Sequence, residues 1–129
     1  MSLTCSVFGT LPNGTEVSAY TLKNAAGTAL TVTPYGCRIL RLLTPDRNGR
    51  FGDVVLGHAT LEEYLGPNFQ GTFVGRYANR IGGASLTIDG ATYALDKNDG
   101  ENTLHGGRGG YHQVLFEVTD TQDGDAPSI

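Results

Sequence analysis

The chain has few of the groups that support nucleic-acid binding or membrane insertion. It has nine Lys and Arg residues among 129, against thirteen Asp and Glu, and its net charge is −4. Binding a phosphate backbone needs a concentrated basic patch, so this shortage argues against nucleic acid as a partner. No window approaches the ~20 apolar residues of a membrane span, and no basic segment precedes an apolar stretch at the N-terminus. We therefore expect a soluble, cytoplasmic protein without a membrane partner.

Cysteine is scarce as well, since Cys5 and Cys37 are the only two. They allow at most one disulfide, and a cytoplasmic chain is expected to keep both reduced, as small buried hydrophobic residues. The histidines His58 and His112, taken with these cysteines, lack the spacing of a zinc finger or of a His-Glu-x-x-His helix. The sequence therefore predicts no metal site, and we expect His112 to be exposed.

Glycine is abundant, with 19 residues, and helix formers at helical spacing are few. This balance favours an all-β fold, formed by residues 1–129 as a single domain or part of one. Asp89 and Gly90 predict a hairpin turn with Leu86 and Tyr93 on its buried face. Thr60 and Glu63 have the spacing of a capping box and predict one short helix over residues 60–65. Strands are expected at residues 3–8, 16–22, 30–33, 37–43, 54–56, 84–88, 91–95 and 114–118.

Two polar motifs carry the chemistry of the chain. Residues 75–81 read Gly-Arg-Tyr-Ala-Asn-Arg-Ile, and residues 102–107 read Asn-Thr-Leu-His-Gly-Gly. Asn79 and Arg80 offer amide and guanidinium donors to hydroxyl oxygens, and His105 titrates near neutrality beside an open glycine backbone. Such a set suits an uncharged, polar ligand. On spacing alone, however, Arg80 could equally be paired with a nearby carboxylate.

In their order, with a predicted hairpin between them, these motifs resemble the aldose 1-epimerase (galactose mutarotase) family. The resemblance covers nearly the whole chain but only the amino-terminal portion of the family pattern. It implies a galactose mutarotase-like β-sandwich, here partial, with mostly antiparallel strands. It also implies an isomerase that needs no cofactor and interconverts the α and β anomers of aldohexoses such as galactose or glucose. Hexose metabolism is the expected setting.

The same resemblance implies roles for individual residues. Arg80, Asn79 and His105 would bind the monosaccharide, and His105 would also take part in catalysis by polarising the sugar ring. In the family, the general base is a late Glu and the general acid is a second His, and this chain offers no match to either. We therefore expect a truncated, incomplete site, and self-association that covers unpaired strand edges and exposed apolar surface.

Other functions remain open at this point. A non-catalytic carbohydrate-binding β-module would use the same polar loops and would leave the rate of anomer exchange unchanged. A relative acting on sugar phosphates would need a basic pocket, for which Arg76 and Arg108 give thin support. The glycines around Arg108 lack the Gly-Lys-Ser/Thr ending of a phosphate-binding loop. A purely structural role would show no dependence on sugar.

Overall fold

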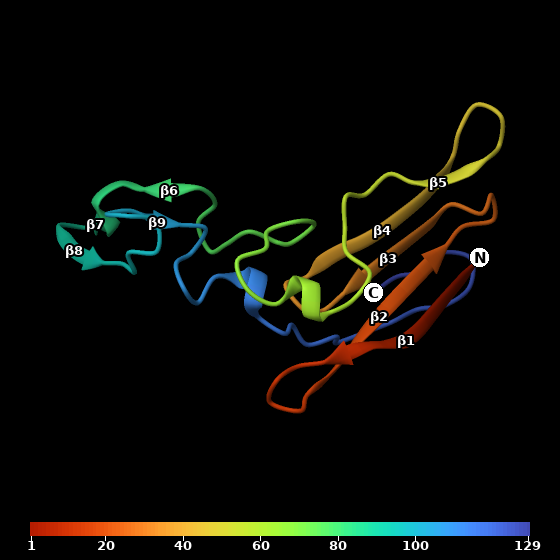
Figure 1. Cartoon of the computed structure of the whole chain (residues 1–129), viewed down its shortest axis with the longest axis horizontal. Coiled ribbons are helices and arrows are strands. Elements are labelled where there is room, and N and C mark those ends of the chain that lie inside the picture. The colour runs from red at the N-terminus through yellow and green to blue at the C-terminus, as the bar shows by residue number, and fades with distance from the viewer.

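The computed structural model describes all residues from Met1 to Ile129. Its main element is an antiparallel sheet of five strands in the order β1-β2-β3-β4-β5. These strands are β1 (Ser2–Thr10), β2 (Glu16–Lys23), β3 (Ala29–Thr33), β4 (Arg38–Pro45) and β5 (Phe51–Asp53). Each strand pairs with the next one in the chain, so the sheet is a simple meander (Figure 1).

Short polar turns fix this meander. The side-chain oxygen of Asn13 accepts a hydrogen bond from the Thr15 backbone, at 3.0 Å, and Asn24 does the same for Thr28. Asp46 accepts from the backbone of Asn48 at 2.7 Å. Asn and Asp form these local bonds readily, which is why they favour reversal of the chain over continued extension.

One face of the sheet carries the main core. Val17 and Leu40 pack there against Leu61 and Tyr64, all of them almost fully buried. Leu61 and Tyr64 belong to the segment around η1 (Glu62–Tyr64), a single turn of 3-10 helix. Burying large apolar side chains stabilises each by about 1.5–3 kcal/mol, so this cluster anchors the segment that follows β5 onto the sheet.

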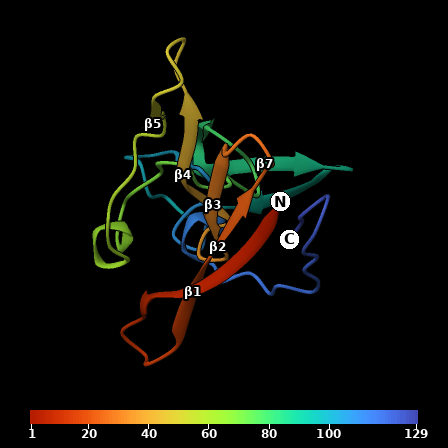
Figure 2. The same cartoon turned by 90° about the vertical axis from the view of Figure 1, so that its right-hand side faces the viewer.

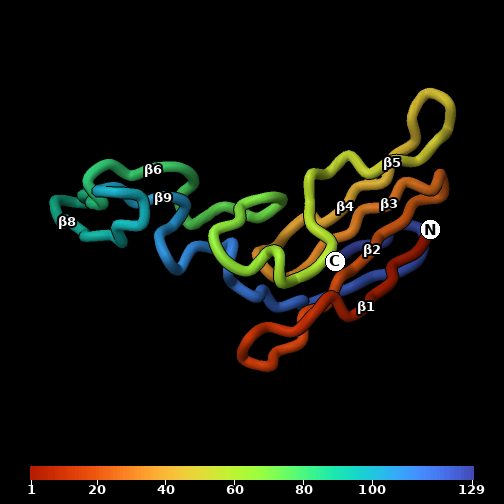
Figure 3. The backbone as a smooth tube through the Cα atoms, viewed as in Figure 1, coloured from red at the N-terminus to blue at the C-terminus, as the bar shows by residue number.

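The remaining elements are short and lie beyond one end of the sheet (Figures 1 and 3). They are β6 (Arg80–Ile81), η2 (Gly82–Ala84), β7 (Ser85–Ile88), β8 (Ala91–Ala94), β9 (Thr103–Leu104) and η3 (Tyr111–Gln113). β6 pairs with β9, and β7 pairs with β8. The chain then returns along the large sheet, so that both termini lie near each other in Figures 1 and 2. There Asp123 accepts a hydrogen bond from the Leu3 backbone at 2.7 Å.

The all-β prediction is confirmed, and the hairpin at Asp89 and Gly90 is found where expected. Both residues have the positive φ values, 49° and 79°, that a type I′ turn requires. The predicted buried face of this hairpin is wrong. Leu86 lies opposite Tyr93 as expected, and Leu86 and Leu95 are partly buried, but Tyr93 and Ile88 are half exposed.

Several other expectations were also wrong. The expected strand at residues 54–56 lies instead at Phe51–Asp53, and residues 114–118 form no strand, because Leu115 makes only an isolated bridge to Tyr35. The helix at 60–65 shrinks to one 3-10 turn, although Glu63 does accept the Thr60 backbone N–H at 3.0 Å. None of the helices is long and apolar enough to cross a membrane.

The cysteines differ from expectation in one respect. Cys5 and Cys37 are both free thiols, as predicted, but both are exposed and not buried. Cys5 lies on the edge strand β1, and Cys37 lies in the turn before β4 with a φ of 44°. Neither cysteine belongs to the core, which forms between one face of the sheet and the η1 segment.

Candidate functional site

The pairing of β6 with β9 brings the two polar motifs together. Arg80 lies opposite Leu104 in this pairing, so Asn79 and His105, each one residue outside it, become neighbours. The backbone N–H of His105 donates to the Asn79 carbonyl oxygen at 3.0 Å. In return, the backbone N–H of Asn79 donates to Nδ1 of the His105 ring at 3.0 Å. These reciprocal bonds hold two motifs that are 26 residues apart.

The second of these bonds determines how His105 can meet a ligand. Because Nδ1 accepts a hydrogen bond, the proton of the neutral ring must be on Nε2. Nε2 is therefore the donor of the neutral ring, on a side chain that is partly exposed. Asn79 and His105 both have positive φ, 63° and 54°, which costs free energy for residues with a Cβ. That strain is concentrated where the two motifs meet.

Arg80 is oriented by two oxygen atoms. Its Nε donates to Asp99 at 2.6 Å, and its Nη1 donates to the Asn79 side chain at 3.3 Å. The arginine side chain nevertheless remains 55% exposed. Both interpretations of Arg80 therefore apply together, because the residue is paired with a carboxylate and still presents guanidinium donors to solvent. The exposed ion pair between Arg80 and Asp99 contributes little stability, and its effect is to orient the Arg80 side chain.

Glycine is required where the motifs touch. Gly106 has a φ of 86°, and a Cβ at this position would overlap the carbonyl group of Gly75. Gly75 is itself buried and accepts a hydrogen bond from the Tyr111 backbone at 3.2 Å. The two motifs can therefore lie backbone to backbone only because residue 106 has no side chain.

His112 does not lie where the sequence predicted. It is buried, only 4% exposed, whereas we expected an exposed residue. Burial lowers the pKa of His112, and the positive charge of Arg38 and the neighbouring His105 lower it further. The ring is therefore neutral near pH 7. This burial has no signal in the residue pattern, because Phe69, the aromatic side chain that packs against His112, comes from a loop 43 residues earlier.

The structure brings Asn79, Arg80 and His105 into one cluster, as predicted. Sequence reasoning missed Asp99, which orients Arg80, and Phe69, whose ring lies 4.7 Å from that of His105 between centroids. Asp99 lies in a polar stretch whose pairing could not be read from spacing. The structure contains no group of three or more His, Cys, Asp or Glu residues that could hold a metal ion.

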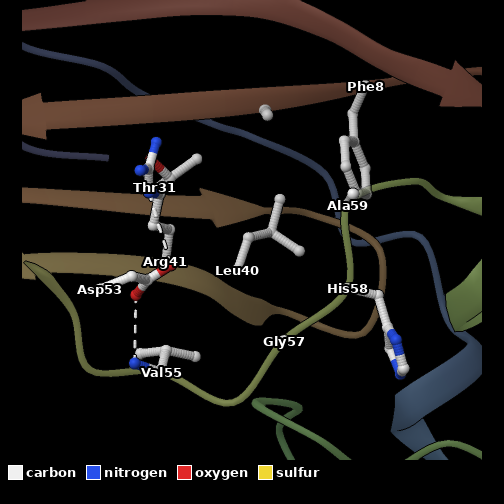
Figure 4. Close-up of a pocket in the computed structure, with 10 residues that line it drawn as sticks. Phe8, Thr31, Leu40, Arg41, Asp53, Val55, Gly57, His58 and Ala59 are labelled. Atoms are coloured by element: carbon white, nitrogen blue, oxygen red, sulfur yellow. Dashed lines mark hydrogen bonds and ion pairs between the residues drawn. The ribbon is translucent and has the colours of Figure 1, made fainter.

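A separate cavity of about 480 Å³ lies on the large sheet (Figure 4). Phe8, Leu40 and His58 line it, together with the ion pair between Arg41 and Asp53, whose nitrogen and oxygen are 3.4 Å apart. None of the predicted site residues contributes to this cavity. The hydrogen-bonding cluster is thus an exposed site at the edge of a small sheet, and the cavity is not part of it.

Fold and site together define an all-β protein with a solvent-facing cluster of hydrogen-bonding groups. The sequence model of the aldose 1-epimerase family matches residues 18–128. A galactose mutarotase from Sus scrofa is 43% identical over 117 residues, which cover 90% of this chain and 34% of that protein. An aldose 1-epimerase from Escherichia coli (strain K12) is 34% identical over 113 residues, which cover 87% of this chain and 33% of that protein.

Solved structures agree with these sequence matches. The crystal structure of the GalM/aldose epimerase homologue from C. elegans has a TM-score of 0.75 and 36% identity, covering 79% of this chain and 32% of that one. Galactose 1-epimerase from Lactobacillus acidophilus NCFM has a TM-score of 0.74 and 28% identity, covering 88% and 32%. The chain belongs to the aldose 1-epimerase family. It spans about a third of the length of the curated relatives it matches.

The contact between the motifs can be tested at Gly106. Gly106→Ala is expected to reduce the free energy of unfolding by roughly 2–4 kcal/mol, because it combines a strained positive φ with overlap of the Gly75 carbonyl. Gly109→Ala is the matched control, since a Cβ there meets nothing within 4 Å. Denaturant unfolding of both variants measures the difference. Equal stability of the two would contradict the described contact.

The buried, neutral His112 predicts a pH dependence. Its pKa in the folded chain lies below the ordinary value of 6.5, so the unfolded chain binds more protons between those two pKa values. Stability should therefore be at its full value above about pH 6.5 and fall as the pH drops toward the folded pKa. Urea unfolding at about pH 7.5 and about pH 5 should show a larger loss for the wild-type chain than for His112→Gln. An identical loss in both would refute the burial of a neutral ring.

Proposed function

We propose that this chain is the sugar-orienting part of an aldose 1-epimerase. Its ligand is an aldohexose such as galactose or glucose, and the parent reaction is interconversion of the α and β anomers. Membership of the family and the names of the relatives support this proposal. The observation that carries it is the reciprocal bonding of Asn79 and His105, with Arg80 oriented beside them.

This cluster suits a neutral, hydroxyl-rich ligand. His105 offers one N–H donor at Nε2, and Arg80 offers the guanidinium N–H groups that Asp99 and Asn79 do not use. Sugar hydroxyl and ring oxygens accept such bonds. Because Asp99 balances the charge of Arg80, the cluster has no excess positive charge of the kind a phosphate ester would require.

Anomer exchange opens the hemiacetal ring, rotates the C1–C2 bond and closes the ring again. A general base removes the proton of the C1 hydroxyl while a general acid protonates the ring oxygen, and the two roles reverse on closure. His105 is placed to polarise the ring and to bind the sugar as the proton moves. The residue types that the family resemblance assigns as base and acid, a late Glu and a second His, have no counterpart in this cluster.

Binding and catalysis can be measured separately. Galactose binding should be weak, with a Kd on the order of millimolar, because an exposed site buries little of the sugar. Arg80→Ala and His105→Ala should each weaken binding roughly tenfold or more, as expected when a hydrogen bond to the ligand is lost. Arg47→Ala, which removes an exposed arginine in the turn between β4 and β5, is the matched control. NMR titration with galactose gives the affinities.

Polarimetry of freshly dissolved α-D-galactose tests the chemical step. We expect binding without acceleration of mutarotation, because the cluster provides orientation and no acid-base pair. Acceleration that disappears in His105→Ala would show that this chain completes the reaction itself. A non-catalytic carbohydrate-binding module would also bind without acceleration. Addition of the carboxyl-terminal part of a family member separates the two cases, because it should restore mutarotation only if this chain is part of an epimerase. Absence of any binding would refute the proposal.

We also propose that the chain works in the cytoplasm and self-associates. Two free, exposed thiols fit a reducing compartment. β1 and β5 are edge strands, and exposed apolar side chains occur on or near both, including Val7, Val54 and Leu56. Exposed edges with apolar residues tend to pair with another chain. Light scattering should therefore give a mass above that of the monomer, and a monodisperse monomer would contradict this proposal.

A further inference from the structure

The ring of His105 rests on another aromatic ring. Phe69 lies between two histidines, with its ring centroid 4.7 Å from that of His105 and 4.5 Å from that of His112. The rings are tilted by 52° and 45°. His105 is therefore held at its Nδ1 edge by the Asn79 backbone and on its face by Phe69. The position of Phe69 thus limits where the sugar-binding Nε2 can lie.

A single buried side chain holds the backbone on both sides of Phe69. Arg38 donates from Nη2 to the carbonyl oxygen of Asn68, at 3.2 Å, and from Nη1 to that of Gln70, at 3.1 Å. Its Nη1 also reaches the Asn68 side chain at 3.2 Å. The residues before and after Phe69 are therefore attached to the same guanidinium group.

The guanidinium group of Arg38 also holds the segment of His112, whose ring packs against Phe69. Nη2 of Arg38 donates to the carbonyl oxygen of His112 at 3.1 Å. This residue lies 74 positions later in the chain, in η3. Phe69, which packs against His105, and His112, which packs against Phe69, are thus both positioned from one point on β4.

Arg38 is itself fixed in place. It is fully buried, and its guanidinium carbon lies 4.5 Å from the centroid of the Tyr64 ring. No carboxylate pairs with it, so its donors are directed to carbonyl oxygens. A planar fork with fixed donor directions can hold several carbonyl groups at once, whereas the point charge of a lysine cannot reproduce that geometry.

We propose that Arg38 is a positioning residue for sugar binding, which acts by fixing the Phe69 ring against which His105 packs, together with the His112 segment that packs on the same ring. Its effect on sugar affinity depends on the function proposed above, but its effect on the His105 ring does not. Loss of Arg38 lets the loop around Phe69 shift, and the Nε2 donor of His105 then moves relative to Arg80. Small displacements of this kind reduce binding strongly.

The test compares substitutions on the same strand and in the ring stack. Arg38→Lys removes the fork and keeps the charge, and Phe69→Leu removes the ring and keeps apolar bulk. Arg41→Lys is the matched control, because Arg41 also lies on β4 but is exposed and paired with Asp53. The chain has three histidines, so NMR of labelled imidazole rings resolves each of them, with His105→Gln identifying the His105 signal.

Arg38→Lys and Phe69→Leu should each shift the His105 ring signals and weaken galactose binding roughly tenfold, or about 1.4 kcal/mol. The double variant should bind no more weakly than Phe69→Leu alone, because Arg38 acts through Phe69. Arg41→Lys should change neither quantity. A merely structural role for Arg38 would instead give additive losses of affinity.

Unchanged His105 signals in Arg38→Lys, or equal effects in Arg41→Lys, would overturn the proposal. If Arg38→Lys fails to fold, Asn68→Ala removes one acceptor of Arg38 and should shift the His105 signals in the same way. If the wild-type chain binds no galactose, the proposed function fails while the ring signals still decide the role of Arg38. The two failures are therefore distinguishable.

Discussion

A buried positive charge without a carboxylate joins the two parts of this chain. The guanidinium of Arg38, at the start of β4, donates to three backbone carbonyl groups in segments that come later in the chain. Removing such a group from water costs several kcal/mol, and burial accordingly lowers the pKa of Arg38. This cost is offset by the hydrogen bonds that Arg38 donates to three carbonyl oxygens. The contact between the guanidinium and the face of the Tyr64 ring offsets it further. The apolar cluster around Val17 and Leu61 joins the η1 segment to the sheet, whereas Arg38 joins the sheet to the segments around Phe69 and His112.

The site beyond the sheet is held together by short-range geometry with little burial. Asn79 and His105 bond each other twice, and Gly106 permits the close approach to Gly75. Since Asn79 is exposed and His105 is partly exposed, their arrangement depends on backbone hydrogen bonds and strained φ angles and owes little to a core of its own. This arrangement suits a polar ligand, because the donors can stay hydrated until a ligand replaces the water.

Local chemistry made much of this predictable. Asp89 and Gly90 predicted a turn because few residue pairs adopt two positive φ angles. The two polar motifs predicted that Asn79, Arg80 and His105 act together, and the structure brings these three residues into one cluster. What could not be predicted depends on distant contacts. His112 is buried because Phe69 and Arg38 reach it from elsewhere in the chain, and neither contact has a signal in spacing. Residues 114–118 are β-prone and apolar enough for a strand, but only one bridge to Tyr35 forms. Pattern predicts what a segment can form, and its neighbours decide whether it does.

In the β7–β8 hairpin, all but one of the strand residues are exposed. A Cβ at Gly90 in its turn would meet nothing within 4 Å, so the tip extends into open solvent. Exposed tips of this kind tolerate inserted sequence well. The hairpin connects directly through η2 to β6, which carries Arg80. A fluorophore or affinity tag placed at the turn would therefore sit on the same hairpin segment that leads to Arg80 without occupying the cluster, so the hairpin offers an attachment point for labelling this protein.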